Sequence, residues 1–446
     1  MSTTVAQDRY TAEKQKFQEL FDQTEAANQQ PAHPLDEYRQ RAMAMVGQLD
    51  FPTRRWEEYK YTSINRILQP DYAIGQAQGV DAADIQAYLP EGMDAHLIVF
   101  VNGQLSDSLS QFAELPAGMH VMLLRDAMDS DRFGSIAREH MDRILKDQDD
   151  IFVALNAAFS QHSLFLYSEK NVACEKPVYI LHLSSNAETP ILNSHMNIAV
   201  AETGSEFAYI EGQFEKQGAT GTYFNNIYNR VAVGPNAHIH HYCLQQEGAE
   251  GFVVNRVDAE QDRDSQFSNY TVDLGGRIVR NNLNTVHKGS NLTTNYYGVY
   301  FGKEQQHIDN HTFIDHAVPH CQSNELYKGI VTDSARGVFN GKVMVRKDAQ
   351  KTNAFQQSSS LVLSNKAEMD SKPQLEIFAD DVKCSHGATI GQLDESSVFY
   401  LRSRGLNDHQ ARAMLQHAFI AEVLEYFKHE QVRDFAEMLI NQKFEQ

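Results

Sequence analysis

Proline placement constrains the fold of this chain more than any other feature of its sequence. Eight of the eleven prolines lie in the first 190 residues, and only Pro235, Pro319 and Pro373 follow. Because proline has no amide hydrogen to donate, it is rare in the interior of β-sheets. The long proline-poor part of the chain can therefore form one continuous run of paired strands.

Short segments rich in Val, Ile, Thr, Tyr and Phe fill the chain from about residue 166, separated by Gly, Asn, Asp and Ser. Examples are YYGVYF at 296–301, YKGIV at 327–331, GKVMV at 341–345 and LEIF at 375–378. No helical pattern of ten or more residues comes between them, which disfavours an alternation of strands and helices. A sandwich, a barrel and a parallel β-helix all agree with this pattern.

Helical patterns flank the strand-rich part on both sides. The N-terminal part is predicted to contain a helix with apolar positions Phe17, Leu20 and Phe21, further helices over 35–49 and 151–165, and short strands at 97–101 and 121–124. This part is therefore mixed, and largely helical.

The C-terminal part is predicted to hold a helix capped by Asn407, with Gln410 at its third position. One stripe of this helix is formed by Ala411, Met414, Leu415, Ala418, Phe419 and Glu422, and it is widened by Ile420, Val423, Leu424 and Phe427. Such a wide stripe is typical of a helix that packs on its own domain, or of one that also offers apolar surface to a partner.

The net charge of the chain limits the classes of partner that it can bind. The chain has 446 residues, with 39 Lys and Arg against 59 Asp and Glu, and its net charge is −20. This argues against non-specific binding to nucleic acid or to an anionic membrane. No signal peptide or membrane span is predicted, and Cys174, Cys243, Cys321 and Cys384 lie singly along the chain. We expect a cytoplasmic protein with free thiols.

The segment HIHHYC at 238–243 is the first candidate metal motif. On a strand, His238 and His240 share one face, and together with Glu247 they resemble a loose copy of a cupin metal site. The spacing departs from that motif on both sides. A cupin-like metal-dependent enzyme using these three residues is thus the alternative function, and polar histidines on an outer strand face are the competing interpretation.

A second histidine cluster, HIDNHTFIDHAVPHC, occupies 307–321. Strand alternation places Ile308 on one face and His307, Asp309, His311 and Asp315 on the other, which predicts a half-buried strand with a polar exterior. The glutamate of a zinc-protease helix is missing. A structural hydrogen-bonding role is favoured over a metal role.

In DDVKCSHGAT at 380–389, Cys384 and His386 would lie on one face of a strand. Two donors do not complete a tetrahedral site, so any metal held there needs ligands from elsewhere, such as another subunit. The alternative is a structural cysteine beside a surface histidine. GVFNGKV at 337–343 lacks the spacing and the Ser or Thr of a phosphate loop, so no nucleotide site is predicted.

Residues 327–389, together with HIDNHTFIDHAVPHC before them and GQLDESSVFYLRSRGL after them, resemble the SufD branch of the SufB/SufD family. This family belongs to the Suf iron–sulfur cluster assembly system. The resemblance is specific from about 270 to 430, diffuse from 165, and includes RWEEYKYTSI at 55–64.

The resemblance implies a mainly β fold, with a right-handed parallel β-helix core and helical regions at both ends. The expected regions are a largely helical part over 1–165, the β-helix over 166–394 and a helical region for ATPase docking over 395–446. It also implies a non-catalytic scaffold subunit that pairs with a SufB-like paralogue and a SufC-like ABC ATPase. A sheet edge suited to a paralogue can also pair with a second copy, so a homodimer of the isolated chain is an open alternative.

By the same resemblance, a nascent iron–sulfur cluster is assembled at the interface between the two subunits. Cys384 and His386 fall at that interface, and no nucleotide is bound by this chain. The paralogue is expected to carry an essential cysteine where this chain has serines, at 358–360. The implied ATPase-docking residues are Arg402, Gly405, Met414, Leu415 and Phe419.

Overall fold

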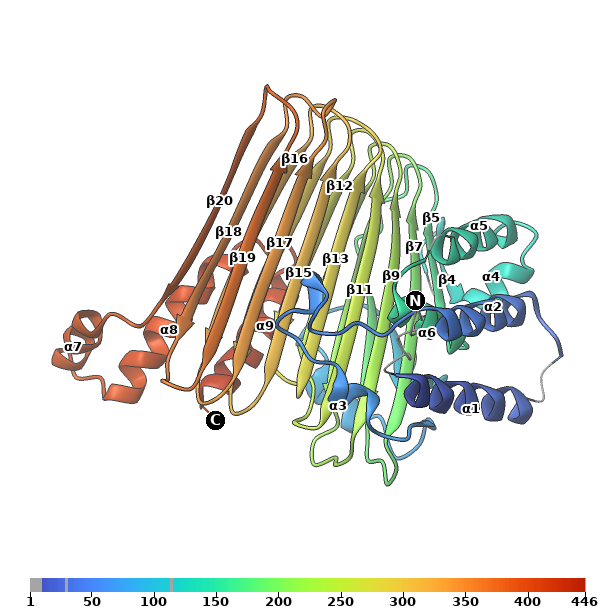
Figure 1. The fold of residues 1–446 in the computed structure, drawn as a ribbon, viewed down its shortest axis with the longest axis horizontal. Coiled ribbons are helices and arrows are strands. Elements are labelled where there is room, and N and C mark those ends of the chain that lie inside the picture. Colours follow the sequence, from blue (N-terminus) through green and yellow to red (C-terminus); the bar gives the residue numbers. More distant parts are fainter. Residues whose placement is uncertain (1–9, 29–30, 113–114, 147, 446) are drawn as a thin grey trace, which may run out of the picture.

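Two long β-sheets stacked face to face form the body of the molecule in the computed structural model (Figure 1). The structure describes residues 10–28, 31–112, 115–146 and 148–445; the first nine residues of the predicted N-terminal region lie outside these ranges. The first sheet contains β1 (Ala73–Ile74), β4 (Met119–Leu123), β5 (Leu164–Ser168), β7 (Ile191–Ala201), β9 (Tyr223–Val233), β11 (Gly251–Gln261), β13 (Ile278–His287), β15 (His307–His316), β17 (Arg336–Val345) and β19 (Glu368–Ile377).

The second sheet alternates with the first along the chain. It contains β2 (His96–Val101), β3 (Gln104–Leu105), β6 (Val178–Ser184), β8 (Glu206–Glu215), β10 (His238–Gln246), β12 (Gln266–Asp273), β14 (Thr293–Gly302), β16 (Gln322–Val331), β18 (Asn353–Val362) and β20 (Lys383–Gly391). From β6 to β20 every neighbouring pair in either sheet is parallel. The chain therefore winds as a parallel β-solenoid, which confirms the predicted fold class.

A left-handed residue recurs at the turn that leads from the first sheet to the second. Its successive positions are Gly204, Asn236, Asp264, Asn291, His320 and Lys351. At most of these turns its amide donates to a carbonyl of the next turn, as in Asn236 to Arg263 at 2.9 Å. Asn and Asp tolerate this conformation better than other side chains. The repeat of about 30 residues is thus carried by turn geometry rather than by a sequence motif.

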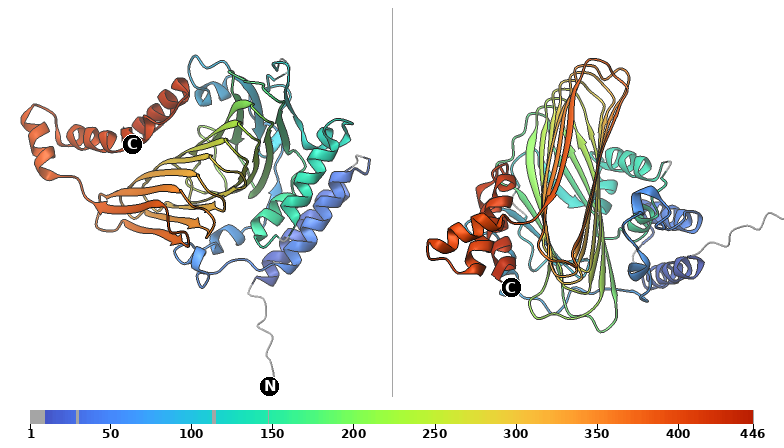
Figure 2. Two further views of the ribbon diagram at one scale, coloured as in Figure 1. Left: turned by 90° about the horizontal axis from the view of Figure 1, so that it is seen from above. Right: turned by 60° about the vertical axis from the view of Figure 1, so that its left-hand side comes forward.

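The N-terminal helices cover the outer face of the first sheet (Figure 2). The short helix η2 (Asp84–Tyr88) packs instead on the second sheet, where Tyr88 contacts Phe214. The helices on the first sheet are α1 (Thr11–Ala27), α2 (Pro34–Gln48), η1 (Glu57–Tyr59), α3 (Asn65–Leu68), α4 (Leu124–Asp129), α5 (Gly134–Leu145) and α6 (Ile151–Ala158). Apolar side chains of these helices pack with Met196 and Phe224 of the sheet. The helix predicted over 151–165 ends at Ala158, because Phe165 belongs to β5.

The C-terminal helices α8 (Asp408–Leu424) and α9 (Glu430–Glu445) pack on the outer face of the second sheet, on the opposite side of the molecule (Figure 2). The helix α7 (Glu395–Ser403) packs against α8 and projects away from the sheet. Tyr270 of the sheet contacts Phe427 with 5.0 Å between ring centroids. Within the described ranges, no helix combines the length and the apolar character needed to cross a bilayer.

Candidate functional site

Cys384 and His386 lie on the last strand of the second sheet, where the solenoid ends. In the parallel register, Cys384 pairs with Ala354 and His386 pairs with Gln356. Ala354 and Gln356 are buried inside the solenoid, and side chains in register point the same way. Cys384 and His386 therefore share the inner face of β20, as the strand pattern predicted, at the open mouth of the solenoid.

The two side chains differ in their surroundings. Cys384 packs beside Ala354 and Val382, and burial raises the pKa of its thiol. His386 is exposed and borders a groove of about 540 Å³ between the end of the second sheet and α8. Among the residues that the structure describes, no three His, Cys, Asp or Glu side chains are grouped so that they could hold a metal ion. Cys384 and His386 alone therefore provide only two of the four donors that a tetrahedral metal site would need.

The residues implied in ATPase docking lie on or beside α7 and α8. Arg402 pairs with Asp408 at 3.3 Å, and Gly405 adopts a φ of 102° in the turn between the helices. Met414 is 56% exposed, and Phe419 is half-buried, with Nζ of Lys328 4.8 Å from its ring centroid. The last of these residues is Leu415, which is half-buried.

The stripe predicted for α8 is only partly the packed face. Ala411 is buried, but Met414, Ala418 and Glu422 are exposed. The buried face near the end of the helix is formed by Ile420, Val423, Leu424 and, just beyond it, Phe427. The position of the second sheet selects that face, so the helix keeps a largely uncovered face with apolar side chains.

The three residues of the cupin-like alternative do not come together. His238 and His240 lie on the outer face of β10, where their ring nitrogens are 3.5 and 3.7 Å from Glu206 carboxylate oxygens. Glu247 is buried and accepts hydrogen bonds from the Tyr223 hydroxyl at 2.8 Å and from Asn225 at 2.6 Å. Burial raises the pKa of Glu247 to about 8.

The polar face of β15 is covered by residues 54–63, a segment that we call the strap. The Thr62 hydroxyl contacts Asp309 and lies 2.7 Å from Nε2 of His307. Asp309 is fully buried and pairs with Arg280 at 2.6 Å, and His311 lies 2.9 Å from both. The predicted polar exterior is therefore a buried hydrogen-bonded junction, in which a guanidinium supplies the positive charge.

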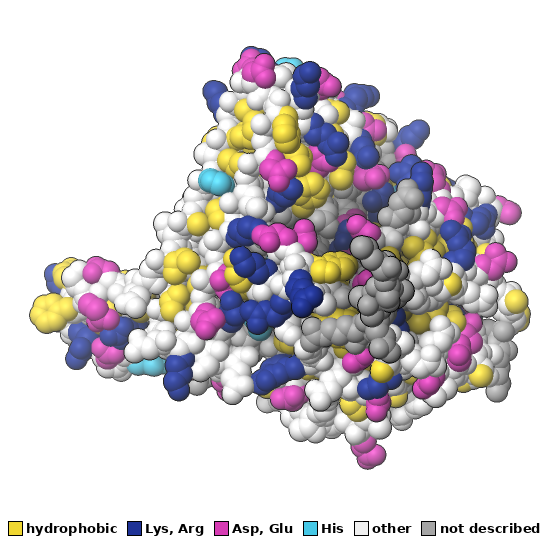
Figure 3. Space-filling view, in the orientation of Figure 1, with side chains coloured by type: hydrophobic (Ala, Val, Ile, Leu, Met, Phe, Trp, Pro, Cys, Tyr) yellow, Lys and Arg dark blue, Asp and Glu magenta, His cyan; other side chains and the backbone are white. Residues whose placement is uncertain are grey.

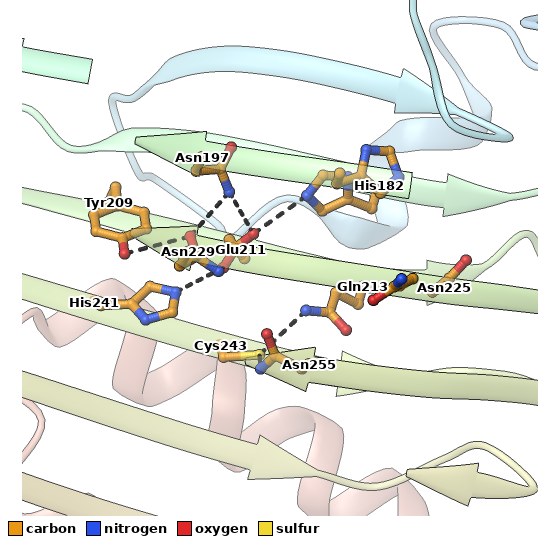
Figure 4. Close-up of polar contacts among 12 residues, drawn as sticks. His182, Asn197, Tyr209, Glu211, Gln213, Asn225, Asn229, His241, Cys243 and Asn255 are labelled. Atoms are coloured by element: carbon orange, nitrogen blue, oxygen red, sulfur yellow. Dashed lines mark hydrogen bonds and ion pairs between the residues drawn. The ribbon is translucent and has the colours of Figure 1, made fainter. Parts of the chain in front are cut away.

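A second polar cluster lies inside the solenoid and was not predicted (Figure 4). The Glu211 carboxylate accepts hydrogen bonds from Asn197 and Asn229, both at 2.8 Å, and lies 2.8 Å from Nε2 of His241. Burial alone would raise the pKa of Glu211, but the neighbouring imidazoles of His182 and His241 outweigh it and hold the pKa well below its usual range. Residues of this cluster come from strands that are stacked in the solenoid and lie about 30 residues apart in the sequence. Their proximity can be recognised only when the pairing register of the strands is known.

Comparison with known proteins agrees with this architecture. The family model for the SufBD core domain of SUF system FeS cluster assembly matches residues 182–419, and that for the SufBD protein N-terminal region matches 11–180. An iron–sulfur cluster assembly SufBD family protein of Synechocystis sp. is 33% identical over 401 residues, which cover 87% of this chain and 86% of that protein.

Two further relatives carry the name iron–sulfur cluster assembly protein SufD. That of Escherichia coli (strain K12) is 29% identical over 386 residues, covering 85% of this chain and 86% of that protein. That of Bacillus subtilis (strain 168) is 32% identical over 307 residues, covering 65% and 67%. On these matches, the chain belongs to the SufBD family of the Suf iron–sulfur cluster assembly system.

Proposed function

We propose that this chain is a non-catalytic, cytoplasmic scaffold subunit that pairs with a SufB-like paralogue and is driven by a SufC-like ATPase. One observation carries the proposal: both sheets end in strands with a free edge, β19 and β20, at the end where Cys384 and His386 face inward. Iron and sulfide are the cargo, and the nascent cluster is shared with the partner.

The free edges of β19 and β20 are suited to pairing with another solenoid. Within the described part of the chain, each strand is hydrogen-bonded to one neighbour only, so its other side presents unpaired N–H and C=O groups. Phe355, Ile377, Phe378 and Ile390 near this end are between 39% and 62% exposed. A second solenoid placed here would extend both sheets and cover these side chains, and a second copy of this chain could do the same when the paralogue is absent.

Pairing with the paralogue would complete the set of ligands that this chain provides only in part. Cys384 and His386 offer one sulfur and one nitrogen donor on one face, and a tetrahedral site needs four. The paralogue would supply the remaining donors, including its expected cysteine near the position of Ser358 to Ser360. Because the pKa of the Cys384 thiol is raised by burial, it becomes a good ligand only when a metal displaces its proton.

The α7 and α8 helices supply a docking surface for the ATPase. Phe399 of α7 is 73% exposed and Met414 of α8 is 56% exposed. Arg412 bridges the two helices by pairing with Glu395 at 3.0 Å, so the surface has a fixed shape. Lys328 of β16 donates to the carbonyl oxygen of Phe419 at 2.7 Å, which links a movement of α8 to the second sheet.

The cluster site is tested by anaerobic co-expression with the SufB-like and SufC-like partners, followed by analysis of iron and acid-labile sulfide. We expect His386→Ala to lower cluster loading at least tenfold while the complex still forms. Ser385→Ala is the matched control, because Ser385 lies on the same strand with its side chain on the other face. Full loading of His386→Ala, or equal losses in both variants, would refute the site.

ATPase docking is tested with a point variant, because truncation would expose the apolar face of the second sheet. We expect Met414→Asp to abolish copurification of the ATPase. Met438→Asp on α9 is the control, since Met438 is 38% exposed and is not one of the five implied docking residues. Stoichiometric copurification with Met414→Asp would contradict the docking surface while leaving the cluster site untouched.

A further inference from the structure

A pocket lined by arginines lies between the strap, the start of α3 and the starts of β13 and β17. Its cavity is about 250 Å³, and Arg54, Arg66, Arg277 and Arg336 line it together with His307. None of the residues that line it is an aspartate or a glutamate. Lys and Arg side chains gather over this part of the face in Figure 3. Four guanidinium groups around one pocket stand out in a chain with a net charge of −20.

Three of these arginines are not neutralised by a carboxylate in the described structure. Arg54 donates to the carbonyl oxygen of Lys60 at 3.1 Å, and Arg277 donates to the side-chain oxygen of Gln305 at 2.8 Å. Arg66 is exposed and has no hydrogen bond or ion pair among the described residues. Only Arg336 is paired, with Asp370 at 2.6 Å and Glu368 at 3.3 Å.

The frame around the pocket is rigid. Thr62, inside the strap, is bonded to His307 and Asp309, and Arg280 donates to the carbonyl oxygen of Glu58 at 2.7 Å. His307 and Arg336 are register partners on neighbouring parallel strands. The elements that carry the guanidinium groups are therefore held next to one another before an anion binds.

We propose that this pocket binds the phosphate or pyrophosphate group of a small molecule. Guanidinium groups bind phosphate oxygens in a bidentate manner, and the hydroxyls of Tyr61 and Ser63 in the lining add neutral donors. A volume of about 250 Å³ is below that of sites which enclose a whole drug-sized ligand, so the pocket takes the anionic group and leaves the rest of the molecule outside.

The test is calorimetric titration of the full chain with inorganic pyrophosphate at low ionic strength, with inorganic phosphate and sulfate as further arms. We expect saturable binding that weakens as salt is added, and at least a tenfold loss of affinity in Arg66→Met. Arg66 has no partner to lose, so the fold is unaffected. Tighter binding of pyrophosphate than of phosphate would identify a diphosphate ligand, and the reverse a single phosphate group.

Arg54→Met and Arg55→Met form a matched pair for the same titration, because Arg55 is exposed beside Arg54 but does not line the pocket. We expect only Arg54→Met to weaken binding. Equal effects of the two variants would show diffuse attraction and overturn the proposal. The proposal would also be overturned if millimolar pyrophosphate did not bind, or if sulfate bound with equal affinity. Binding of an acidic peptide, and of none of these anions, would identify a protein contact instead.

Discussion

The buried ion pair between Arg280 and Asp309 gives the sharpest test of how the strap is held on the solenoid. Nη1 of Arg280 lies 2.6 Å from Oδ2 of Asp309, and the two side chains are 2% and 1% exposed. Asp309→Asn leaves the guanidinium buried without its counter-charge, which costs on the order of 3–5 kcal/mol. Arg280 also donates to the carbonyl oxygen of Glu58 and lies over the ring of Tyr59. The strap should therefore detach from the sheet before the solenoid unfolds.

Trp56 makes the effect measurable, since it is the only tryptophan in the sequence and lies in the strap. Its fluorescence reports on that segment, while far-ultraviolet circular dichroism reports on the solenoid. In a urea titration of Asp309→Asn, we expect the fluorescence transition to fall at a lower urea concentration than the circular dichroism transition. In the unchanged chain the two transitions should lie close together.

An exposed pair elsewhere in the chain provides the control. Arg41 pairs with Asp142 at 3.3 Å and both side chains are more than half exposed, so Arg41→Met should cost only about 0–1 kcal/mol. The double variant Arg280→Met/Asp309→Leu should cost less than the sum of its two single changes, because neither charge is left buried alone. Strictly additive costs, together with coincident transitions in Asp309→Asn, would refute the reasoning.

Three further predictions concern other parts of the fold. Burial raises the pKa of Glu247 from 4.5 to about 8, so the folded chain keeps a proton that the unfolded chain releases. The free energy of unfolding should therefore fall as the pH rises between those values. Urea titrations at several pH values should show that the unfolding free energy of Glu247→Gln changes less with pH. Gly298→Ala places a Cβ against the ring of Tyr327 and should lower the free energy of unfolding by about 1–3 kcal/mol in the same assay. Asn407→Ala removes the capping box with Gln410 and should cost about 1 kcal/mol, seen as increased amide hydrogen exchange in the first turn of α8.

Structure that depends on neighbouring residues was predictable from the sequence. The Asn407 side chain accepts from the amide of Gln410, as its position before the helix indicated. The alternation of β20 placed Cys384 and His386 on one face, which the register bears out. In both cases a short-range pattern contains the information, because the backbone period alone decides where the side chains point.

Contacts between distant parts of the chain were not predictable in this way. Thr62 and Asp309 are separated by 247 positions, and nothing in the pattern of β15 indicates that a segment covers its polar face. The same reason applies inside the solenoid, where Glu211 meets Asn197, Asn229 and His241 from neighbouring turns. Such clusters exist only once the register is fixed, and the register is set by turns whose sequences vary.

The two ends of the solenoid are built differently, and this difference bears on the role of the chain. At the N-terminal end, antiparallel pairs close the sheets: β3 pairs with β2, and β4 pairs with β5. At the C-terminal end, in the described structure, β19 and β20 end the sheets without such a pair. Solenoids need a capping element at each end to cover the last turn. Since the last inward-facing positions include the small residues Ser358 and Ala388, this end cannot close itself by packing. On the proposed pairing, the partner solenoid would be the missing cap, so that closing the fold and completing the ligand set around His386 would be one event.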